Sequence, residues 1–187
     1  MTSRYPLGAA ANPPRTSRLP DPVMRVRSMR SMTTESCPVA NRAQLEKLLL
    51  ADPWVDELGA EIVEWDGGRA TFRLTPEARH CNFVGTVHGG VLFGLADAAL
   101  GVACNSWGRV CLALTVETQF LSAAPAGETL VATAVERSRT RRTAAYAIDV
   151  VSEADGALRA GFSAMAFRTG RWHLGEDAWS EDWRSTH

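Results

Sequence analysis

Residues 91–104 read VLFGLADAALGVAC, and this stretch decides the fold. Thirteen of its fourteen residues are apolar or glycine, and the exception is Asp97. A helix of this length is too short to cross a bilayer, which needs about 20 residues, and it is too apolar to lie on a surface. The sequence therefore predicts a helix from roughly Gly90 to Cys104 that a sheet must wrap.

The segments on either side of this helix supply the sheet. Between residues 60 and 74 the pattern alternates around Asp66-Gly67-Gly68, which is typical of a β-hairpin. Four further strands are expected after the helix, at residues 112–121, 128–137, 143–152 and 157–168. Strands joined mostly by hairpins imply an antiparallel sheet, so the predicted class is α+β with a six-stranded antiparallel sheet around one helix.

A shorter helix is expected before the hairpin. Asn41 and Gln44 have the spacing of a capping box, and a leucine stripe follows them. Asp52-Pro53 ends that helix, because the residue before a proline is disfavoured in helical conformation.

The amino-acid composition excludes several classes of protein. The chain has 187 residues, 45 % of them apolar, and a formal net charge of −1, which is ordinary for one globular domain with loose ends. It argues against a disordered chain, a fibre or a strongly basic nucleic-acid binder. Four cysteines, at positions 37, 81, 104 and 111, form no CxxC pair. This favours free thiols in a reducing cytoplasm over disulfides or a zinc site, and no metal site is predicted.

The first forty residues differ from the rest. They hold six of the nine prolines and six arginines, against only two acidic residues. Two interpretations stay open: a transit peptide, or an extended or misassigned start. We treat residues 1–40 as a disordered tail, 41–170 as the folded domain, and 171–187 as a polar tail that contains tryptophans.

Asp97 needs an explanation, because an ionised carboxylate among apolar residues costs several kcal/mol unless it is paired or hydrogen-bonded. A structural Asp bonded to nearby backbone and a functional carboxylate are both possible. An N-cap role is disfavoured, since Asp97 lies about two turns inside the helix. Just before the helix stands Gly85-Thr86-Val87-His88-Gly89-Gly90, whose free amides suit developing negative charge and can form an oxyanion hole. Its simpler interpretation is a tight turn.

The spacing of these two features adds a constraint. Gly89 and Asp97 are eight residues apart, which is about 12 Å along a helix axis. A general base must lie within about 3 Å of the water that it activates. Two copies of the helix, packed antiparallel about a two-fold axis, can bring the Asp of one to the helix start of the other. The site, if it is catalytic, belongs to a dimer.

The run NFVGTVHGG at residues 82–90, followed by LADAA at 95–99, resembles the hotdog-fold acyl-CoA thioesterases, and within them the PaaI-like subgroup of phenylacetate degradation proteins. The similarity covers roughly residues 45–168. It implies the hotdog fold, in which a six-stranded sheet wraps one long helix. It also implies hydrolysis of acyl-CoA thioesters, with CoA as part of the substrate and no cofactor.

The resemblance also assigns the catalytic roles. Asp97 would activate water as general base, or attack directly. Gly89 would present its amide to the thioester oxygen, and Asn82 and His88 would orient the thioester or the water. Thr115, on the strand after the helix, would help to hold the water.

Coenzyme A would lie in a groove lined by residues 122–127 and 140–145, and therefore by Ser122 and Thr140. Arg139, Arg141 and Arg142 could meet its phosphates, although for any single one of them a solvated strand end is the simpler interpretation. The resemblance implies a homodimer and favours a cytoplasmic homotetramer, with neither nucleic acid nor membrane as a partner. PaaI likeness points to aryl-acetyl or other medium acyl groups.

Two alternatives remain. A hotdog hydratase is disfavoured, because neither the Gly-Asp-x-Asn-Pro nor the Phe-Pro-Gly signature is present. A non-enzymatic acyl-CoA sensor is disfavoured by Asp97, and no DNA-reading helix-turn-helix precedes the domain.

Overall fold

A computed structural model describes residues 38–187 of the chain. Its helices are α2 (Val39–Leu49), α3 (Pro53–Leu58), α4 (Gly89–Asn105) and α5 (Glu181–Thr186), with short 3-10 turns η1 (Ala78–His80) and η2 (Glu176–Ala178). Its strands are β1 (Glu61–Asp66), β2 (Arg69–Leu74), β3 (Arg109–Phe120), β4 (Leu130–Arg139), β5 (Thr143–Ser152) and β6 (Leu158–Trp172). The expectations for residues 1–37, including the transit peptide and Cys37, fall outside this range.

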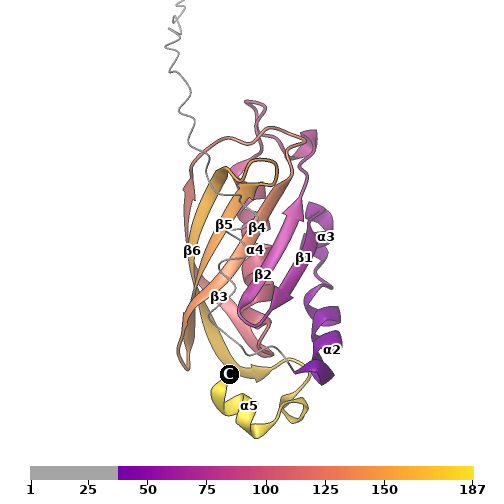
Figure 1. Cartoon of the computed structure of the whole chain (residues 1–187), viewed down its shortest axis with the longest axis vertical. Coiled ribbons are helices and arrows are strands. Elements are labelled where there is room, and N and C mark those ends of the chain that lie inside the picture. The colour runs from indigo at the N-terminus through magenta and orange to yellow at the C-terminus, as the bar shows by residue number, and fades with distance from the viewer. Residues whose placement is uncertain (1–37) are drawn as a thin grey trace, which may run out of the picture. The chain divides into compact units, whose positions relative to one another are not determined.

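The six strands form one antiparallel sheet in the order β1-β2-β4-β5-β6-β3, and the sheet curves around α4 (Figure 1). The predicted α+β class and the sheet around one helix are therefore confirmed. The hairpin turns at Gly67-Gly68, between β1 and β2. No helix within residues 38–187 has the length and apolar character needed to cross a membrane.

The start of the described chain differs from the prediction. The helix α2 begins at Val39 after Pro38, so the capping box at Asn41 and Gln44 is wrong. The Asn41 side chain instead donates to the Ala178 carbonyl, 2.8 Å away. Asp52-Pro53 does end α2, but it also begins α3, in which the Asp52 carboxylate caps the Trp54 amide. Capping-box spacing marks a candidate helix start only, and here a tertiary contact uses the same side chain.

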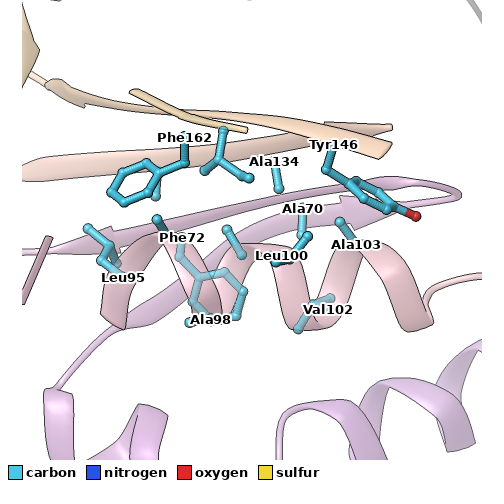
Figure 2. Close-up of a cluster of buried hydrophobic side chains, with 14 of the residues drawn as sticks. Ala70, Phe72, Leu95, Ala98, Leu100, Val102, Ala103, Ala134, Tyr146 and Phe162 are labelled. Carbon is cyan, nitrogen blue, oxygen red and sulfur yellow. The ribbon is translucent and has the colours of Figure 1, made fainter. Parts of the chain in front are cut away.

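One face of α4 makes the core. Leu95, Ala99 and Ala103 are fully buried, and Figure 2 shows how α4 side chains meet those of the sheet. The small alanines of β2, β4 and β6 leave room for the helix, while Phe72 and Phe162 fill the remaining space.

The opposite stripe of α4 is open in the single chain. Gly90, Phe93, Asp97 and Gly101 are exposed, and their spacing of three or four residues places them on one line along the helix. The sheet wraps α4 as predicted, but it leaves this one stripe of the helix uncovered. Apolar composition shows that a face avoids water, but it does not show whether the same chain or another covers it.

The C-terminal end of α4 is held by buried polar groups. Glu136 Oε2 accepts from Trp107 Nε1 at 3.0 Å and from the Tyr146 hydroxyl at 2.8 Å. Burial, and then the charge of Glu136, hold the pKa of Tyr146 far above its usual value, so the phenol keeps its proton and donates it. These bonds attach the helix end to two strands.

The segment assigned to a polar tail, residues 171–187, packs on this end of the domain. Trp179 is 3 % exposed and donates to the His173 carbonyl. Trp183 donates to the Trp107 carbonyl, and the ring of His187 stacks on that of Trp183. Aromatic stacking therefore fastens α5 beneath the end of α4.

Gly67 tests this packing. A β-carbon there would lie 2.3 Å from the Trp107 ring, so we expect Gly67→Ala to lower the free energy of unfolding by about 1–3 kcal/mol in denaturant titration. Gly161→Ala is the matched control, since nothing lies within 4 Å of its β-carbon position, and we expect a change within about 0.5 kcal/mol. Equal stability of the two variants would contradict the tight contact.

Candidate active site

The start of α4 presents an amide to solvent-accessible space. His88 is the N-cap, and its Nδ1 accepts the Gly90 N–H at 2.8 Å. The Gly89 N–H precedes the helical ladder, and in the described part of the chain it has no acceptor. This end of the helix carries partial positive charge, so the amide is a ready donor to an oxyanion.

The capping bond also sets the chemistry of His88. Because Nδ1 accepts a hydrogen bond from the Gly90 amide, the neutral ring carries its own proton on Nε2. The ring is exposed, so Nε2 is free to donate to a substrate atom. His88 thus caps α4 through Nδ1, and only its Nε2 is available to a ligand.

Asn82 shapes the loop before the helix. Its Oδ1 accepts from the amides of Val84 and Thr86, and its Nδ2 donates to the Thr86 hydroxyl at 3.0 Å. One N–H of the carboxamide remains after these bonds. The structure therefore uses Asn82 mainly to hold the 82–86 turn, and the side chains of Phe83 and Val84 extend outward from that turn.

Asp97 carries a carboxylate with no hydrogen bond to any other residue between 38 and 187. Desolvation by its apolar surroundings, and then the charge of Asp52, raise the pKa of Asp97 above its ordinary value. Asp52 comes close because α3 packs beside α4, where a β-carbon at Gly94 would lie 3.4 Å from the Trp54 ring. A half-desolvated carboxylate without a partner is typical of a general base.

Phe120 covers the glycine at the helix start. A β-carbon at Gly89 would lie 3.1 Å from the Phe120 ring, which also packs edge-on against Phe162, with centroids 6.5 Å apart. Phe93, on the open stripe of α4, makes a similar contact with Phe162 at 6.1 Å. The amide and the carboxylate are therefore bordered by exposed aromatic rings.

Thr115 lies on β3, the edge strand of the sheet, opposite Met165. Its side chain is exposed, and among the described residues no hydrogen bond joins it to Asp97 or Gly89. The strand has an irregularity just before it, between Ala113 and Thr115. A single copy of the chain thus does not assemble Thr115 with the carboxylate.

The predicted coenzyme A residues divide between the two ends of β6. The Ser122 hydroxyl donates to the Leu158 carbonyl at the start of that strand. Thr140 organises the turn between β4 and β5, and its carbonyl accepts from Arg168, ten residues further along β6. That separation is about 33 Å. Within one chain these two groups cannot touch the same phosphate.

The arginines of the second group differ in exposure. Arg141 and Arg142 are exposed in the turn. Arg139 is mostly buried, pairs with Glu136 at 3.3 Å, and stacks over the Trp107 ring at 4.2 Å. Only the two turn residues have side chains that extend freely into solvent.

Comparison with known proteins identifies the family of this chain. Residues 84–158 match the Thioesterase superfamily. The acyl-coenzyme A thioesterase PaaI of Escherichia coli is 38 % identical over 102 residues, which is 54 % of this chain and 73 % of that protein. The chain belongs to the thioesterase superfamily. It is a PaaI-like member of the hotdog fold, and its class of reaction is thioester hydrolysis.

Solved structures agree. The E. coli PaaI protein from the phenylacetic acid degradation operon is 32 % identical with a TM-score of 0.68, and the match covers 73 % of this chain and 99 % of that one. A mutant of the phenylacetic acid degradation protein PaaI from Thermus thermophilus is 37 % identical with a TM-score of 0.61, covering 63 % and 100 %. Both matches support the hotdog fold for this chain, with its six-stranded antiparallel sheet around α4.

Two residues that adjoin the candidate site could not be found from the sequence. Asp52 was interpreted only as a helix stop, although it acts on Asp97 across 45 positions of sequence. Phe120 was interpreted only as part of a strand. An Asp before Pro marks an N-cap, but nothing local indicates which helix lies next to it.

The charge of Asp52 generates a prediction for pH dependence. Without it, Asp97 should ionise at lower pH, so Asp52→Asn should move the acidic limb of the kcat/KM profile for thioester hydrolysis to lower pH. Asn still caps α3, so the fold is kept. Asp56→Asn, in the same helix, is the control and should leave the limb in place. An unchanged limb in Asp52→Asn would remove Asp97 as the titrating base.

Proposed function

We propose that the protein hydrolyses acyl-CoA thioesters, with an aryl-acetyl group such as phenylacetyl as the acyl part, at a site shared by two copies of the chain. Water and acyl-CoA give a carboxylate, a proton and free coenzyme A. One observation supports the proposal most directly. The same helix, α4, carries the Asp97 carboxylate on its open stripe and the Gly89 amide at its start, and neither group has a hydrogen-bond partner among the described residues.

The geometry supports a dimer. Gly89 and Asp97 are about 12 Å apart on one helix, so one thioester carbonyl cannot meet both in one chain. Packing two α4 helices antiparallel along their open stripes places Asp97 of one beside Gly89 of the other. The exposed edge of β3 offers unpaired backbone and exposed leucines, at positions 112 and 114, for the same contact. Two such dimers would form the homotetramer that the resemblance favours.

In the proposed reaction Asp97 takes a proton from water, and the water oxygen bonds to the thioester carbonyl carbon. The carbonyl oxygen becomes an oxyanion and accepts the Gly89 N–H of the second copy, with His88 Nε2–H as a further donor. The oxyanion then re-forms the C=O bond, the C–S bond breaks, and the sulfur takes the proton from Asp97. No redox step occurs.

Aromatic side chains support the acyl group. Phe93 and Phe120 are exposed beside Gly89 and pack on Phe162. A planar aryl ring stacks favourably in such surroundings. The similar E. coli protein is encoded in a phenylacetic acid degradation operon, which points to the same substrate class.

Coenzyme A would then be held by both copies. Ser122, at the Gly89 end, and the turn with Thr140, Arg141 and Arg142, at the other end, are brought together only if the chains pack antiparallel. Guanidinium groups bind phosphates through paired hydrogen bonds, with Arg139 behind the turn. The free thiols of Cys104 and Cys111 support a reducing compartment such as the cytoplasm.

Asp97→Asn tests the base directly. We expect loss of phenylacetyl-CoA hydrolysis by at least 100-fold in a free-thiol assay, with benzoyl- and fatty acyl-CoAs alongside. The folded-state pKa of Asp97 is raised, so its charge opposes folding above the ordinary Asp pKa, and the variant should melt no lower than the parent at pH 7. Normal turnover by Asp97→Asn would contradict the mechanism.

Gly89→Pro tests the amide. Proline removes the N–H, yet it is favoured at the first helical position, and His88 already has the extended conformation that precedes proline. We expect a loss of about 100- to 1,000-fold in kcat. Gly89→Ala, which keeps the N–H and makes the same contact with Phe120, is the control and should lose far less.

Mixing the two variants tests the shared site. A heterodimer of Asp97→Asn and Gly89→Pro chains has one fully intact site if each site takes one group from each copy. We therefore expect activity to return when the two are co-expressed with separate affinity tags and purified on both. Inactive heterodimers would place both groups in one chain and overturn the dimer geometry.

A further inference from the structure

A basic pocket lies at the end of α4 opposite to Gly89. It has a volume of about 530 Å³, and its lining includes five arginines and a tryptophan: Arg109, Arg139, Arg141, Arg168, Arg184 and Trp172. No Asp or Glu is among the described residues that line it. The family match ends at residue 158, so two of these arginines lie beyond it, Arg168 on β6 and Arg184 on α5.

Arg168 is the central group of this pocket. Its side chain belongs to β6, and the residue is only 5 % exposed. One nitrogen, Nη1, donates to the Thr140 carbonyl, but the buried Nη2 has no hydrogen-bond partner. No carboxylate in the described range pairs with Arg168, and a buried guanidinium without an anion is costly. Desolvation, then the charges of Arg109 and Arg139, lower the pKa of Arg168.

The neighbouring arginines have spare donors as well. Arg139 forms an ion pair with Glu136, but its Nη1 is buried without a hydrogen-bond partner. Arg184 forms an ion pair with Glu176, and its Nε is likewise buried without a partner. The five arginines of the pocket carry five positive charges. Glu136, Glu176 and the α-carboxylate of His187 supply three negative charges, which leaves an excess of two positive charges. The partial negative charge at the end of α4 amounts to only about half a charge, so it cannot balance the difference.

We propose that this pocket binds a phosphate-bearing small molecule, held by Arg168 with Arg109, Arg139 and Arg184. Guanidinium forks match phosphate oxygens in pairs, and an excess of two positive charges suits a phosphate dianion or a diphosphate. The volume exceeds that of one phosphate and fits a nucleotide-sized group, and Trp172 lies in the wall of the pocket with Arg109 over its ring.

The phosphate can come from two sources. One is the nucleotide end of a coenzyme A substrate bound in the dimer, and this source rests on the proposed function. The other is a separate nucleotide-type ligand. Both present the same chemistry to the arginines, and kinetics distinguishes them.

Isothermal titration of the full-length chain with pyrophosphate and with adenosine 3′,5′-bisphosphate tests binding without reference to catalysis. We expect one saturable site per chain, weaker at 200 mM than at 50 mM salt. Arg168→Gln should weaken it at least tenfold. Arg184→Gln, on α5 and away from the sheet, should also weaken it, and it keeps the test decisive if the Arg168 variant is unstable. Arg171→Gln, an exposed neighbour that does not line the pocket, should bind as the parent does.

Kinetics then assigns the source. If Arg168→Gln raises KM for phenylacetyl-CoA but not for S-phenylacetyl-pantetheine, the pocket holds the nucleotide end of the substrate. If neither KM changes while bisphosphate binding is lost, it holds a separate ligand. Absence of saturation by both probes at 10 mM, or unchanged binding in both the Arg168 and Arg184 variants, would overturn the proposal. A chain that binds the probes but hydrolyses no thioester would contradict the proposed function alone.

Discussion

The unpartnered carboxylate of Asp97 is the constraint on which the site depends. It is held on a helix whose other faces are apolar, and its pKa is raised by desolvation and by Asp52. A group in this state is costly for folding and useful for proton transfer. Because its helix is rigid, the carboxylate cannot move the 12 Å or so to the Gly89 amide. The proposed chemistry therefore takes its second group from a second helix.

The two ends of α4 have different roles. Its start offers the Gly89 amide beside exposed aromatic rings, whereas its end is fixed by Trp107, Tyr146 and Glu136 through part-buried hydrogen bonds. The fixed end holds the helix in the sheet, so the open end and the open stripe can remain incomplete without loss of the fold. The proposed dimer completes the stripe, and the proposed phosphate pocket lies beside the fixed end.

The arginines illustrate how function and stability share residues. Arg139 stacks on Trp107 and pairs with Glu136, so it supports the end of α4, yet one of its nitrogens remains unsatisfied. Arg168 has a hydrogen bond but no carboxylate. Buried cations without an anionic partner lower the stability of the fold. Binding of the proposed anionic ligand would therefore stabilise the β4–β5 turn and α5, which line its pocket.

Local patterns in the sequence determined the α+β class, the hairpin at Gly67-Gly68, the buried helix and the isolation of Asp97, because apolar periodicity and turn chemistry act between near neighbours. The motif around His88 and Gly89 indicated the thioesterase family. Only the tertiary structure decided that one stripe of α4 stays open, that Asp52 acts on Asp97, and that Arg168 lines one pocket with Arg139 and α5. These contacts depend on strand register and on the packing of layers, which join residues far apart in sequence and leave no local pattern.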